Sequence, residues 1–397
     1  MLDDIAMIEI PSADRRHLLI TGATGLLGSY LVRDLLLDGQ PVALVVRGSR
    51  RESPAQRVDA QLIHWENELG KRLPRPRVFD GDMTRPLCGL GADDLSWIGE
   101  HCCSVLHNAA SLNFRGADRA AEPWLSNVSG VRNVLDLVQA TDIEHFHHVS
   151  TAYVCGLRSG RIAENDLECG QKYGNDYERS KVEAEQLVRA ASGPRTVTVY
   201  RPSIIVGDSH SGYTSTYHGL FAALRLGHTL LTRVAIGSTS GPALLGLLGI
   251  DLTACKNFVP VDWVSAVIAH AVQTPSARGQ TLHLTHPEPL SMATLGALIQ
   301  EAVERFSQAA AADDPDLCDE QWFAENLRTQ LDVYRTYFRN DPFFDRSNLE
   351  AVAGHIPCPV LDHPTLLRMA RFAIEQDFGR LAKPSTLAAK TMSVQVS

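Results

Sequence analysis

Short hydrophobic runs alternate with longer amphipathic stretches along most of the chain. Short apolar runs bounded by turn residues predict buried strands, and apolar residues at helical spacing predict helices. Strands that alternate with helices are typical of an α/β fold with a parallel sheet. The predicted strands lie at 17–20, 41–46, 78–79, 104–107, 145–149 and 281–284, and a sixth strand followed by a turn lies within 196–208. The predicted helices lie at 26–37, 54–73 and 127–140, after 177, from about 256 through 271, and from 292 onward.

A glycine-rich turn joins the first predicted strand to the first predicted helix. Gly22, Gly25 and Gly28 are spaced three residues apart within it. Because Gly22 and Gly25 lack side chains, backbone N–H groups and a helix N-terminus can approach a pyrophosphate, and Gly28 allows the helix to pack closely on the strand. An ordinary tight turn is the alternative, but the flanking strand and helix favour a dinucleotide site. The predicted cofactor contacts in this turn are Gly22, Thr24, Gly25, Leu26, Leu27 and Gly28.

The residue after the second predicted strand indicates which dinucleotide is bound. This residue is Arg47, whereas an acid at this position would hydrogen-bond the ribose of NAD. A positive charge suits the additional phosphate of NADP, so we expect NADPH as the cofactor. Arg47, Arg50, Arg51 and Arg57 form a basic cluster in an acidic chain. Arg47 and then Arg57 are the preferred phosphate ligands, and a solvated surface loop is the alternative interpretation.

Polar and small residues follow three further predicted strands. Asp82 is expected to accept a hydrogen bond from the adenine amino group, although a turn-forming Asp has the same local sequence. Small residues after the fourth strand allow the backbone to approach the cofactor, with a capped helix start as the alternative. A turn after the sixth strand is expected to close over the nicotinamide. These further predicted cofactor contacts are Asp82, Met83, Asn108, Ala109, Ala110, Pro202 and Ser203.

A tyrosine and a lysine four residues apart, Tyr177 and Lys181, open a predicted helix downstream of the fifth strand. They share one helix face, so we expect the Lys181 ammonium and the positive ring of oxidised nicotinamide to lower the pKa of Tyr177 toward neutrality. Thr151 is expected to stabilise charge on the substrate oxygen, because strand alternation points Ser150 to the other face. Lys181 is also expected to hold the nicotinamide ribose. The predicted catalytic set is therefore Thr151, Tyr177 and Lys181, of which the last two also contact the cofactor; a pair on a helix surface is the alternative.

Composition and charge narrow the class of protein. The formal net charge of −9 argues against nucleic acid or an anionic membrane as the main partner. The eight cysteines lack zinc-ligand spacing, and the histidines at 145, 147 and 148 are interpreted as core and surface residues, so no metal is expected. The first residues show no signal-peptide pattern, and the longest apolar stretch, 242–250, is too short to span a bilayer. We therefore expect a cytoplasmic protein with reduced thiols and without stable membrane insertion.

The motifs described above occur in the blocks LLITGATGLLGSYLVRDLL, VVRG, FDGDMTRPLCGL, HNAASLNF, HVSTAYVCG, YERSKVEAE and YRPSIIVGDS. These blocks, over about residues 15–290, resemble the extended short-chain dehydrogenase/reductases and, more narrowly, their thioester reductase branch. That branch contains fatty acyl-CoA reductases and the terminal reductase domains of carboxylic acid reductases and nonribosomal peptide synthetases. The resemblance implies that Thr151, Tyr177 and Lys181 are catalytic and that Arg47 and Arg57 bind the phosphate. Related epimerases and steroid dehydrogenases share most of these blocks.

The resemblance implies a Rossmann-type, doubly wound parallel sheet with a smaller, mostly helical C-terminal substrate domain. Within that C-terminal part, 309–316 is interpreted as a linker, and aromatic residues between 322 and 344 as core rather than ligand pocket. Residues 1–16 are expected to be a loose lead-in. The predicted segments are an NADP-binding domain over 1–208, a substrate-mouth insertion over 209–256, a return to the first domain over 257–290, a helical substrate or lid region over 291–382, and a disordered tail over 383–397.

These observations lead to three hypotheses. The first is an NADPH-dependent reductase that converts an acyl thioester, bound to CoA or to a carrier protein, to an aldehyde or further to an alcohol. No adenylation or carrier domain is apparent in the sequence, so the thioester would come from elsewhere. The second is a sugar-nucleotide epimerase or dehydratase, or a ketone or hydroxysteroid-type dehydrogenase. The third is a cofactor-sensing regulator, which the complete Thr, Tyr and Lys set argues against. The acyl group and the oligomeric state stay open.

Overall fold

The computed structural model describes residues 17–116, 118–233, 241–247, 249–307 and 339–380. These described residues form two compact units. The sheet unit contains residues 17–205, 257–289 and 340–359, and the helical unit contains the described parts of 206–256, 290–339 and 360–397. Each unit is therefore built from segments that are distant in sequence.

The sheet unit is built on parallel strands. Its main strands are β1 (His17–Thr21), β2 (Val42–Val46), β3 (Arg77–Asp80), β4 (Cys102–His107), β5 (His145–Val149), β7 (Thr196–Pro202) and β11 (Thr281–Leu284). In the described part of the chain these seven form one sheet in the order β3-β2-β1-β4-β5-β7-β11, with parallel neighbours throughout. Leu19 of β1 lies opposite Ala43 of β2 and Val105 of β4. Every residue of β2 is buried, as expected for a parallel sheet covered on both faces.

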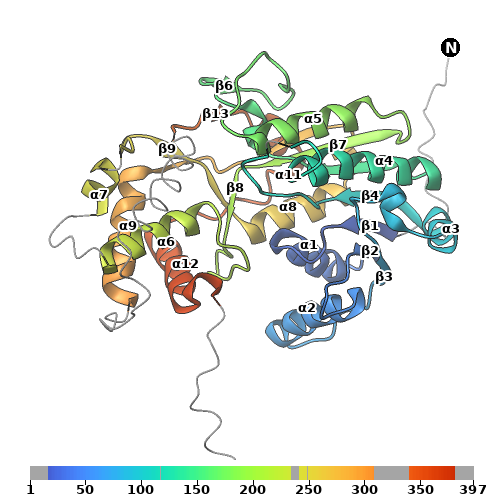
Figure 1. The fold of residues 1–397 in the computed structure, drawn as a ribbon, viewed down its shortest axis with the longest axis horizontal. Coiled ribbons are helices and arrows are strands. Elements are labelled where there is room, and N and C mark those ends of the chain that lie inside the picture. The colour runs from blue at the N-terminus through green and yellow to red at the C-terminus, as the bar shows by residue number, and fades with distance from the viewer. Residues whose placement is uncertain (1–16, 117, 234–240, 248, 308–338, 381–397) are drawn as a thin grey trace, which may run out of the picture. The chain divides into compact units, whose positions relative to one another are not determined.

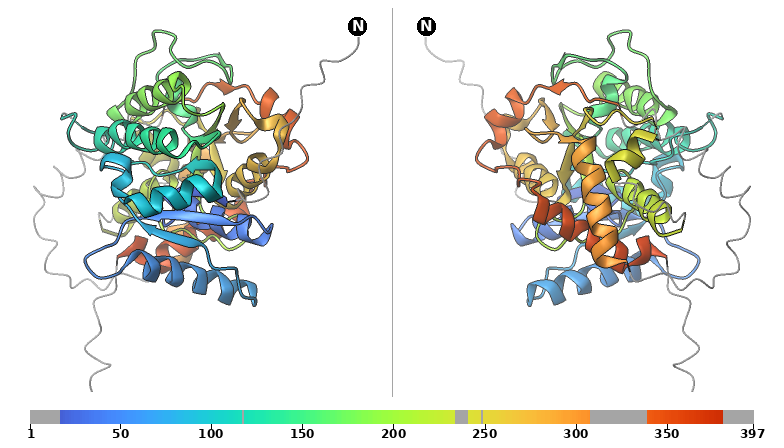
Figure 2. Two further views of the ribbon diagram at one scale, coloured as in Figure 1. Left: turned by 90° about the vertical axis from the view of Figure 1, so that its right-hand side faces the viewer. Right: turned by 90° about the vertical axis from the view of Figure 1, so that its left-hand side faces the viewer.

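Helices cover both faces of this sheet (Figures 1 and 2). They are α1 (Leu26–Leu37), α2 (Pro54–Leu69), α3 (Ala92–His101), α4 (Gly130–Thr141), α5 (Asp176–Ala190), α8 (Val261–Gln273) and α11 (Ser347–Ala353). Helix α1 contacts α8 on one face, and α4 contacts α3 and α5 on the other. On the second face, Leu19, Val105 and Phe146 of the strands pack in one core with Val134 and Val188 of the helices. The predicted α/β architecture with a parallel Rossmann-type sheet is confirmed.

Local sequence signals explain where helix α2 begins and ends. Ser53 caps its start through a reciprocal capping box with Gln56, and Pro54 occupies the first turn. The prediction that this helix extends to residue 73 is wrong, because Gly70 adopts the left-handed conformation, with a φ of 64°. A single glycine therefore ends the helix four residues early.

A late segment of the chain completes the sheet unit. The short strand β13 (Phe343–Phe344) pairs in parallel with β6 (Arg161–Ile162), and α11 contacts β11 and α8. Residues 340–359 therefore belong to the sheet unit, whereas the sequence predicted them within one helical region over 291–382. Residues 209–256 likewise group with the helical unit instead of forming a separate insertion.

The helical unit centres on α9 (Met292–Phe306), which contacts α6 (Leu220–Arg233), α7 (Gly241–Leu247) and α12 (His363–Glu375). A short antiparallel pair joins β9 (Cys255–Lys256) to β12 (Leu290–Ser291). Where the sequence predicted loops and one helix over 209–256, the described residues form the two helices α6 and α7. Apolar side chains that meet in the core of this unit include Leu220, Phe221, Leu224, Leu295, Leu298, Ile299 and Leu366.

Short elements connect the larger ones. They are η1 (Pro86–Gly89), the π-helical turn η2 (Leu125–Ser129), η3 (Ala152–Cys155), β8 (Ile204–Val206), β10 (Phe258–Pro260), η4 (Pro275–Ala277) and η6 (Asp377–Gly379). The lead-in at 1–16, the linker at 309–316, the aromatic residues between 322 and 338 and the tail at 383–397 lie outside the described residues. Of the helices that the structure describes, none is long and apolar enough to cross a membrane.

Candidate active site

Two glycines of the turn between β1 and α1 are required by the packing of the protein itself. Gly22 has a φ of +71°, and a Cβ there would lie 2.6 Å from the backbone nitrogen of Ala109. A Cβ on Gly28 would lie 2.0 Å from the carbonyl oxygen of Gly22. Gly28 therefore lets α1 pack against its own preceding turn, and not chiefly against the strand as predicted.

The third glycine of the turn, Gly25, has no such requirement. Its φ of −79° suits any residue, and its nearest contact for an added Cβ would be the Gly22 oxygen at an ordinary 3.6 Å. Gly25 is the N-cap of α1, which has no side-chain cap and no acidic residue in its first turn. The uncapped N–H groups of this helix end form a cradle for an anion. The turn therefore has the form that suits a pyrophosphate, and the contacts of Gly22, Thr24, Gly25, Leu26, Leu27 and Gly28 with a cofactor stay a prediction.

The loop after β4 is held against the glycine turn. Asn108 Nδ2 donates a hydrogen bond to the Gly22 oxygen at 3.1 Å, and the Ala109 N–H donates to Thr21 Oγ1 at 3.4 Å. Thr21 Oγ1 also lies 2.8 Å from His107 Nδ1. The structure thus brings the predicted cofactor contacts Asn108 and Ala109, followed by the exposed Ala110, beside the turn.

The predicted basic cluster contains two arginines with different contacts. Arg57 Nη2 donates to Thr24 Oγ1 at 3.0 Å, and its Nη1 donates to the Arg47 carbonyl oxygen. Arg47 lies 3.4 Å from Asp82 Oδ2, and its side chain is 69% exposed. Gln61, which the sequence analysis missed, donates to the Ala23 oxygen at 3.1 Å, one helical turn after Arg57. Helix α2 therefore supports the glycine turn and places Arg47 beside it.

Asp82 is engaged in the turn after β3. Its Oδ1 accepts hydrogen bonds from the Thr84 N–H at 3.0 Å and the Thr84 hydroxyl at 2.8 Å. Burial raises the pKa of Asp82, but the bonds from Thr84 and Arg47 outweigh it and hold the pKa below its ordinary value. The turn-forming interpretation of Asp82 is thus confirmed, and its contact with adenine stays a prediction. The neighbouring Met83 accepts a bond from Asn133 Nδ2 at 2.8 Å through its carbonyl oxygen.

Thr151, Tyr177 and Lys181 come together at the carboxyl end of β5. Thr151 is 4% exposed; its hydroxyl lies 3.4 Å from the Pro202 oxygen and accepts from the Tyr153 N–H at 3.3 Å, and it acts to lower the pKa of the Tyr177 phenol. Lys181 is 2% exposed and donates from Nζ to the Val149 oxygen at 2.8 Å. Tyr177 lies in the first turn of α5, whose start Asn175 caps by accepting from the Glu178 N–H at 2.9 Å. The hydroxyl, the phenol and the ammonium predicted from the sequence therefore form one cluster.

Burial dominates the electrostatics of this cluster. Burial of the phenol raises the pKa of Tyr177 to about 12, and the Thr151 hydroxyl offsets only part of that shift. Burial also lowers the pKa of Lys181 to about 8, against the opposing charge of Glu185. In the protein alone, burial therefore determines the pKa of Tyr177; that Lys181 and an oxidised nicotinamide ring together lower this pKa stays a prediction. At neutral pH Tyr177 is therefore a proton donor.

The residues beside Thr151 serve other contacts. Ser150 Oγ donates to Glu185 Oε2 at 2.8 Å, so its hydroxyl is engaged two helical turns beyond Tyr177; that Ser150 faces away from the reacting groups stays a prediction. Thr151 Oγ1 lies 3.4 Å from the Pro202 oxygen, so Pro202 borders the cluster. Ser203 Oγ donates to Asn257 Oδ1 at 2.7 Å, and this bond fixes the turn after β7. That Pro202 and Ser203 close over a nicotinamide stays a prediction.

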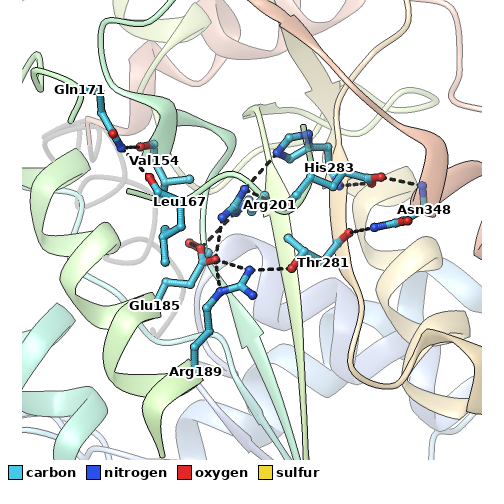
Figure 3. Close-up of polar contacts among 11 residues, drawn as sticks. Val154, Leu167, Gln171, Glu185, Arg189, Arg201, Thr281, His283 and Asn348 are labelled. Carbon is cyan, nitrogen blue, oxygen red and sulfur yellow. Dashed lines mark hydrogen bonds and ion pairs between the residues drawn. The ribbon is translucent and has the colours of Figure 1, made fainter. Parts of the chain in front are cut away.

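Two buried groups near the cluster were missed by the sequence analysis. Asn127, in the π-helical turn η2, donates to Ser180 Oγ at 2.9 Å and accepts from the Ser111 N–H at 2.8 Å, which joins the loop after β4 to α5. Glu185 and Arg201 form an ion pair at 2.7 Å with fully buried side chains (Figure 3). The sequence did contain a signal for each group. Asn127 is a polar residue on an otherwise apolar helix face, and Glu185 lies four residues after Lys181, on the same helix face.

The three histidines of β5 are all buried, so the prediction that some lie at the surface is wrong. His145 Nδ1 lies 2.8 Å from Thr196 Oγ1, and His147 Nδ1 lies 3.0 Å from the Tyr200 hydroxyl. The strand is central in the sheet, so both of its faces are covered. Within the described residues, no group of three or more His, Cys, Asp or Glu side chains could hold a metal ion.

Comparison with known families identifies the chain. The family model described as "Male sterility protein", an NAD-binding domain, matches residues 20–268. The chain belongs to this family. It is thereby a member of the extended short-chain dehydrogenase/reductases, which are NAD(P)-dependent oxidoreductases, and the resemblance seen in the sequence is confirmed.

Curated relatives of this family member are larger proteins. The chain is 27% identical to the aldehyde reductase lnaA of Aspergillus flavus over 89% of its own length and 35% of the relative. It is 28% identical to the isonitrile lipopeptide synthase of Streptomyces coeruleorubidus, covering 69% of the chain and 18% of the relative. It is 27% identical to the L-2-aminoadipate reductase large subunit of Penicillium chrysogenum, covering 70% and 20%. The chain thus spans about a third or less of each relative.

Solved structures share the fold. The terminal R domain from the myxalamid PKS-NRPS pathway matches with a TM-score of 0.71 at 24% identity, covering 94% of both chains. A thiolation-reductase di-domain from an archaeal nonribosomal peptide synthetase gives 0.67 at 18% identity, covering 91% of this chain and 76% of the other. The UDP-glucuronic acid 4-epimerase from Bacillus cereus, in complex with UDP-glucuronic acid and NAD, gives 0.59 at 18% identity, covering 91% and 99%. Reductase domains and epimerases therefore share the architecture of this family member.

Proposed function

We propose that the chain is an NADPH-dependent reductase that converts an acyl thioester to an aldehyde. The observation that carries this proposal is the grouping of Thr151, Tyr177 and Lys181 at the end of β5, with the Tyr177 phenol protonated at neutral pH. The curated relatives named for aldehyde and aminoadipate reduction, and the R-domain structures, support the same reaction class. A second reduction of the aldehyde would give the alcohol.

Each residue of the cluster has a defined part in this reaction. Reduced nicotinamide, when bound, supplies the hydride that attacks the thioester carbonyl carbon. Thr151 and Tyr177 donate hydrogen bonds to the carbonyl oxygen as it gains charge, and Tyr177 delivers a proton to it. The resulting hemithioacetal loses its C–S bond and gives aldehyde and thiol. Lys181 holds positive charge one helical turn from Tyr177 and stabilises the phenolate left after the proton transfer.

NADPH is proposed over NADH because of the arginines beside the glycine turn. Arg47 is exposed at the end of β2, and Arg57 is fixed against Thr24. Guanidinium groups bind phosphate through paired hydrogen bonds, so this pair suits the additional phosphate on the adenosine ribose of NADPH. No acidic side chain replaces Arg47 at the end of β2.

The thioester is proposed to arrive on CoA or on a carrier protein. The thiolation-reductase di-domain structure pairs a carrier with a reductase in its own chain, and this likeness in fold supports a carrier-bound substrate here. A thioester carries its acyl group on a thiol that leaves readily once the carbonyl carbon is reduced. The same chemistry serves both carriers, so the substrate panel must contain both.

Reduction of a thioester can be tested directly. The purified chain is mixed with NADPH and a panel of acyl-CoA and acyl-carrier thioesters, and NADPH oxidation, aldehyde and free thiol are measured. Wild-type protein should form aldehyde and thiol in equal amounts. Tyr177→Phe should lower kcat by about a hundredfold or more, because it removes the proton donor. Tyr173→Phe is the matched control and should keep wild-type kcat. Absence of NADPH oxidation with every thioester would refute the proposal.

An epimerase on the same fold is the second candidate. The likeness to UDP-glucuronic acid 4-epimerase in fold supports it. The two candidates differ in their treatment of the cofactor, because an epimerase regenerates its NAD in each turnover, whereas a reductase releases oxidised cofactor. Tightly retained NAD(H) after purification, with epimerised sugar nucleotide as product, would favour the epimerase.

A further inference from the structure

One buried carboxylate joins the three elements that surround the reacting groups. Glu185 lies on the same face of α5 as Tyr177 and Lys181. Its Oε2 accepts from Ser150 Oγ at 2.8 Å and from Arg201 Nε at 3.1 Å, and its Oε1 accepts from Arg201 Nη2 at 2.7 Å. Through this single side chain, helix α5 is tied to Arg201 of β7 (Figure 3) and to Ser150 at the end of β5.

The residues tied by Glu185 are direct neighbours of the reacting groups. Ser150 precedes Thr151, and its N–H donates to the Tyr200 oxygen at 2.7 Å. Arg201 precedes Pro202, whose oxygen accepts from Thr151 Oγ1 at 3.4 Å. Because Tyr177 and Glu185 belong to one helix, the bond from Ser150 to Glu185 links the position of Thr151, the next residue, to that of Tyr177.

The far side of Arg201 is fixed as well. Its Nη1 donates to the Glu164 oxygen at 3.0 Å and lies 3.3 Å from His283 Nε2. The Glu164 carboxylate accepts from the backbone N–H groups of His283 at 2.9 Å and Asn348 at 2.6 Å. The ion pair is thus held by the edge strand β11 and by the late segment that contains α11.

Glu185 and Arg201 both stay charged although their side chains are fully buried. Burial acts to raise the pKa of Glu185, but Arg201 and Arg189 hold it below its ordinary value, so the carboxylate stays ionised. A buried ion pair seldom stabilises a fold more than packed apolar side chains would, since both charges lose their hydration. A stable fold alone would therefore not require this pair, whereas a fixed orientation of neighbouring groups would.

We propose that Glu185 and Ser150 are positioning residues that hold the end of β5, with Thr151, in a fixed place beside the first turns of α5, with Tyr177, in the geometry needed for carbonyl reduction. The inference rests on the proposed function, because reduction of a carbonyl gives its kinetic readout. Neither residue touches the substrate. Both act by keeping the end of β5 in a fixed position against α5.

Ser150→Ala is the variant that tests this inference with the least damage. It removes the bond between β5 and Glu185 and leaves the ion pair with Arg201 intact, so the fold is kept. We expect kcat to fall by about tenfold or more, because even a small displacement of a catalytic group from its working position strongly lowers the rate of reaction. The KM values for NADPH and thioester should stay within about twofold of wild type, because neither binding surface changes.

Arg189→Gln is the matched control. Arg189 also bonds Glu185 Oε1, at 2.8 Å, but its side chain is 34% exposed and its other partner is Thr281 in β11. It touches no neighbour of Thr151, so its kcat should stay within about twofold of wild type. A wild-type kcat for Ser150→Ala would overturn the inference. An equal loss of kcat in both variants, matched by equal losses in melting temperature, would also overturn it.

A crystal structure of Ser150→Ala gives a readout that needs no substrate. We expect the Thr151 hydroxyl to move away from its wild-type position relative to the Tyr177 phenol, while Arg189→Gln leaves both groups where they are in the wild type. An unmoved Thr151 in Ser150→Ala would count against the inference even if the chain reduced no thioester. Failure of the wild-type protein to reduce any thioester would instead count against the proposed function.

Discussion

At the scale of single residues, two arginines of one basic cluster have separate tasks. Arg57 bonds Thr24 in the glycine turn and the Arg47 carbonyl oxygen, so its guanidinium supports the backbone. Among the described residues, Arg47 has one ion pair, a long one with Asp82, and its side chain is mostly exposed. The Arg47 side chain is therefore the more available of the two to a bound phosphate, whereas Arg57 also supports the turn itself.

Arg47→Ser should change the cofactor preference. Loss of a charged hydrogen bond to the additional phosphate of NADPH costs about 1.5–3 kcal/mol, so the Kd for NADPH should rise by about ten- to a hundredfold. The Kd for NADH should be unchanged, because NADH lacks that phosphate. Fluorescence titration with each cofactor measures both values. Arg50→Ser, three residues away, is the control and should bind NADPH as wild type does; equal weakening for both cofactors by Arg47→Ser would contradict this assignment.

The pH dependence of reduction should follow Lys181 and not Tyr177. The pKa of Tyr177 is about 12, so the phenol keeps its proton throughout the neutral and mildly alkaline range. The pKa of Lys181 is about 8, so its ammonium loses its proton as the pH rises through that value. The charge that stabilises the developing phenolate is then lost, and kcat should fall above a pH of about 8. A kcat profile against pH tests this, and a rate that rises through the same range would contradict it.

At the scale of elements, the glycines of the turn between β1 and α1 have two different roles. Gly28 is needed for the packing of the protein, whereas Gly25 is proposed to face the ligand. Gly28→Ala would place a Cβ 2.0 Å from the Gly22 oxygen, so this variant should fold poorly or not at all. Gly25→Ala meets only an ordinary contact at 3.6 Å and should keep the wild-type melting temperature. Its methyl group should nevertheless lower NADPH affinity by about tenfold or more, because it lies over the uncapped end of α1.

Thermal melting and NADPH titration of the two variants, measured side by side, test this division. The expected pattern is loss of stability for Gly28→Ala and loss of binding alone for Gly25→Ala. Wild-type NADPH affinity in Gly25→Ala would place the pyrophosphate elsewhere.

Most elements were predictable because their signals are local. Apolar runs marked β1, β2, β4 and β5, and the glycine turn followed by helical spacing marked α1. The electrostatics of Tyr177 were not predictable, because the desolvation of its phenol depends on the complete packing around it. The role of Glu185 was not predictable either, since its partners Ser150 and Arg201 are 35 and 16 residues away in the chain.

At the scale of the whole molecule, the least predictable feature is the composition of the sheet unit. Residues 340–359 join it through β13, a strand of only two residues that shows no periodic pattern, and through the short helix α11. Besides the buried apolar residues Phe344, Leu349 and Ala353, isolated polar side chains bind this segment. Asp341 is one of them, because its Oδ2 accepts from the Tyr153 hydroxyl at 2.8 Å and from the Asn257 N–H at 2.7 Å.

Asp341→Ala should therefore destabilise the sheet unit, although Asp341 lies far along the chain from the strands of the main sheet. The change removes the acceptor of two donors, at a cost of about 1–3 kcal/mol in the free energy of unfolding, measured with denaturant. Glu350→Ala, on the exposed side of α11, is the control and should change stability little. If the Tyr153 bond carries part of the loss, Tyr153→Phe should cost less in the Asp341→Ala background than in wild type. Strict additivity of the two changes would show that this bond does not join the late segment to η3.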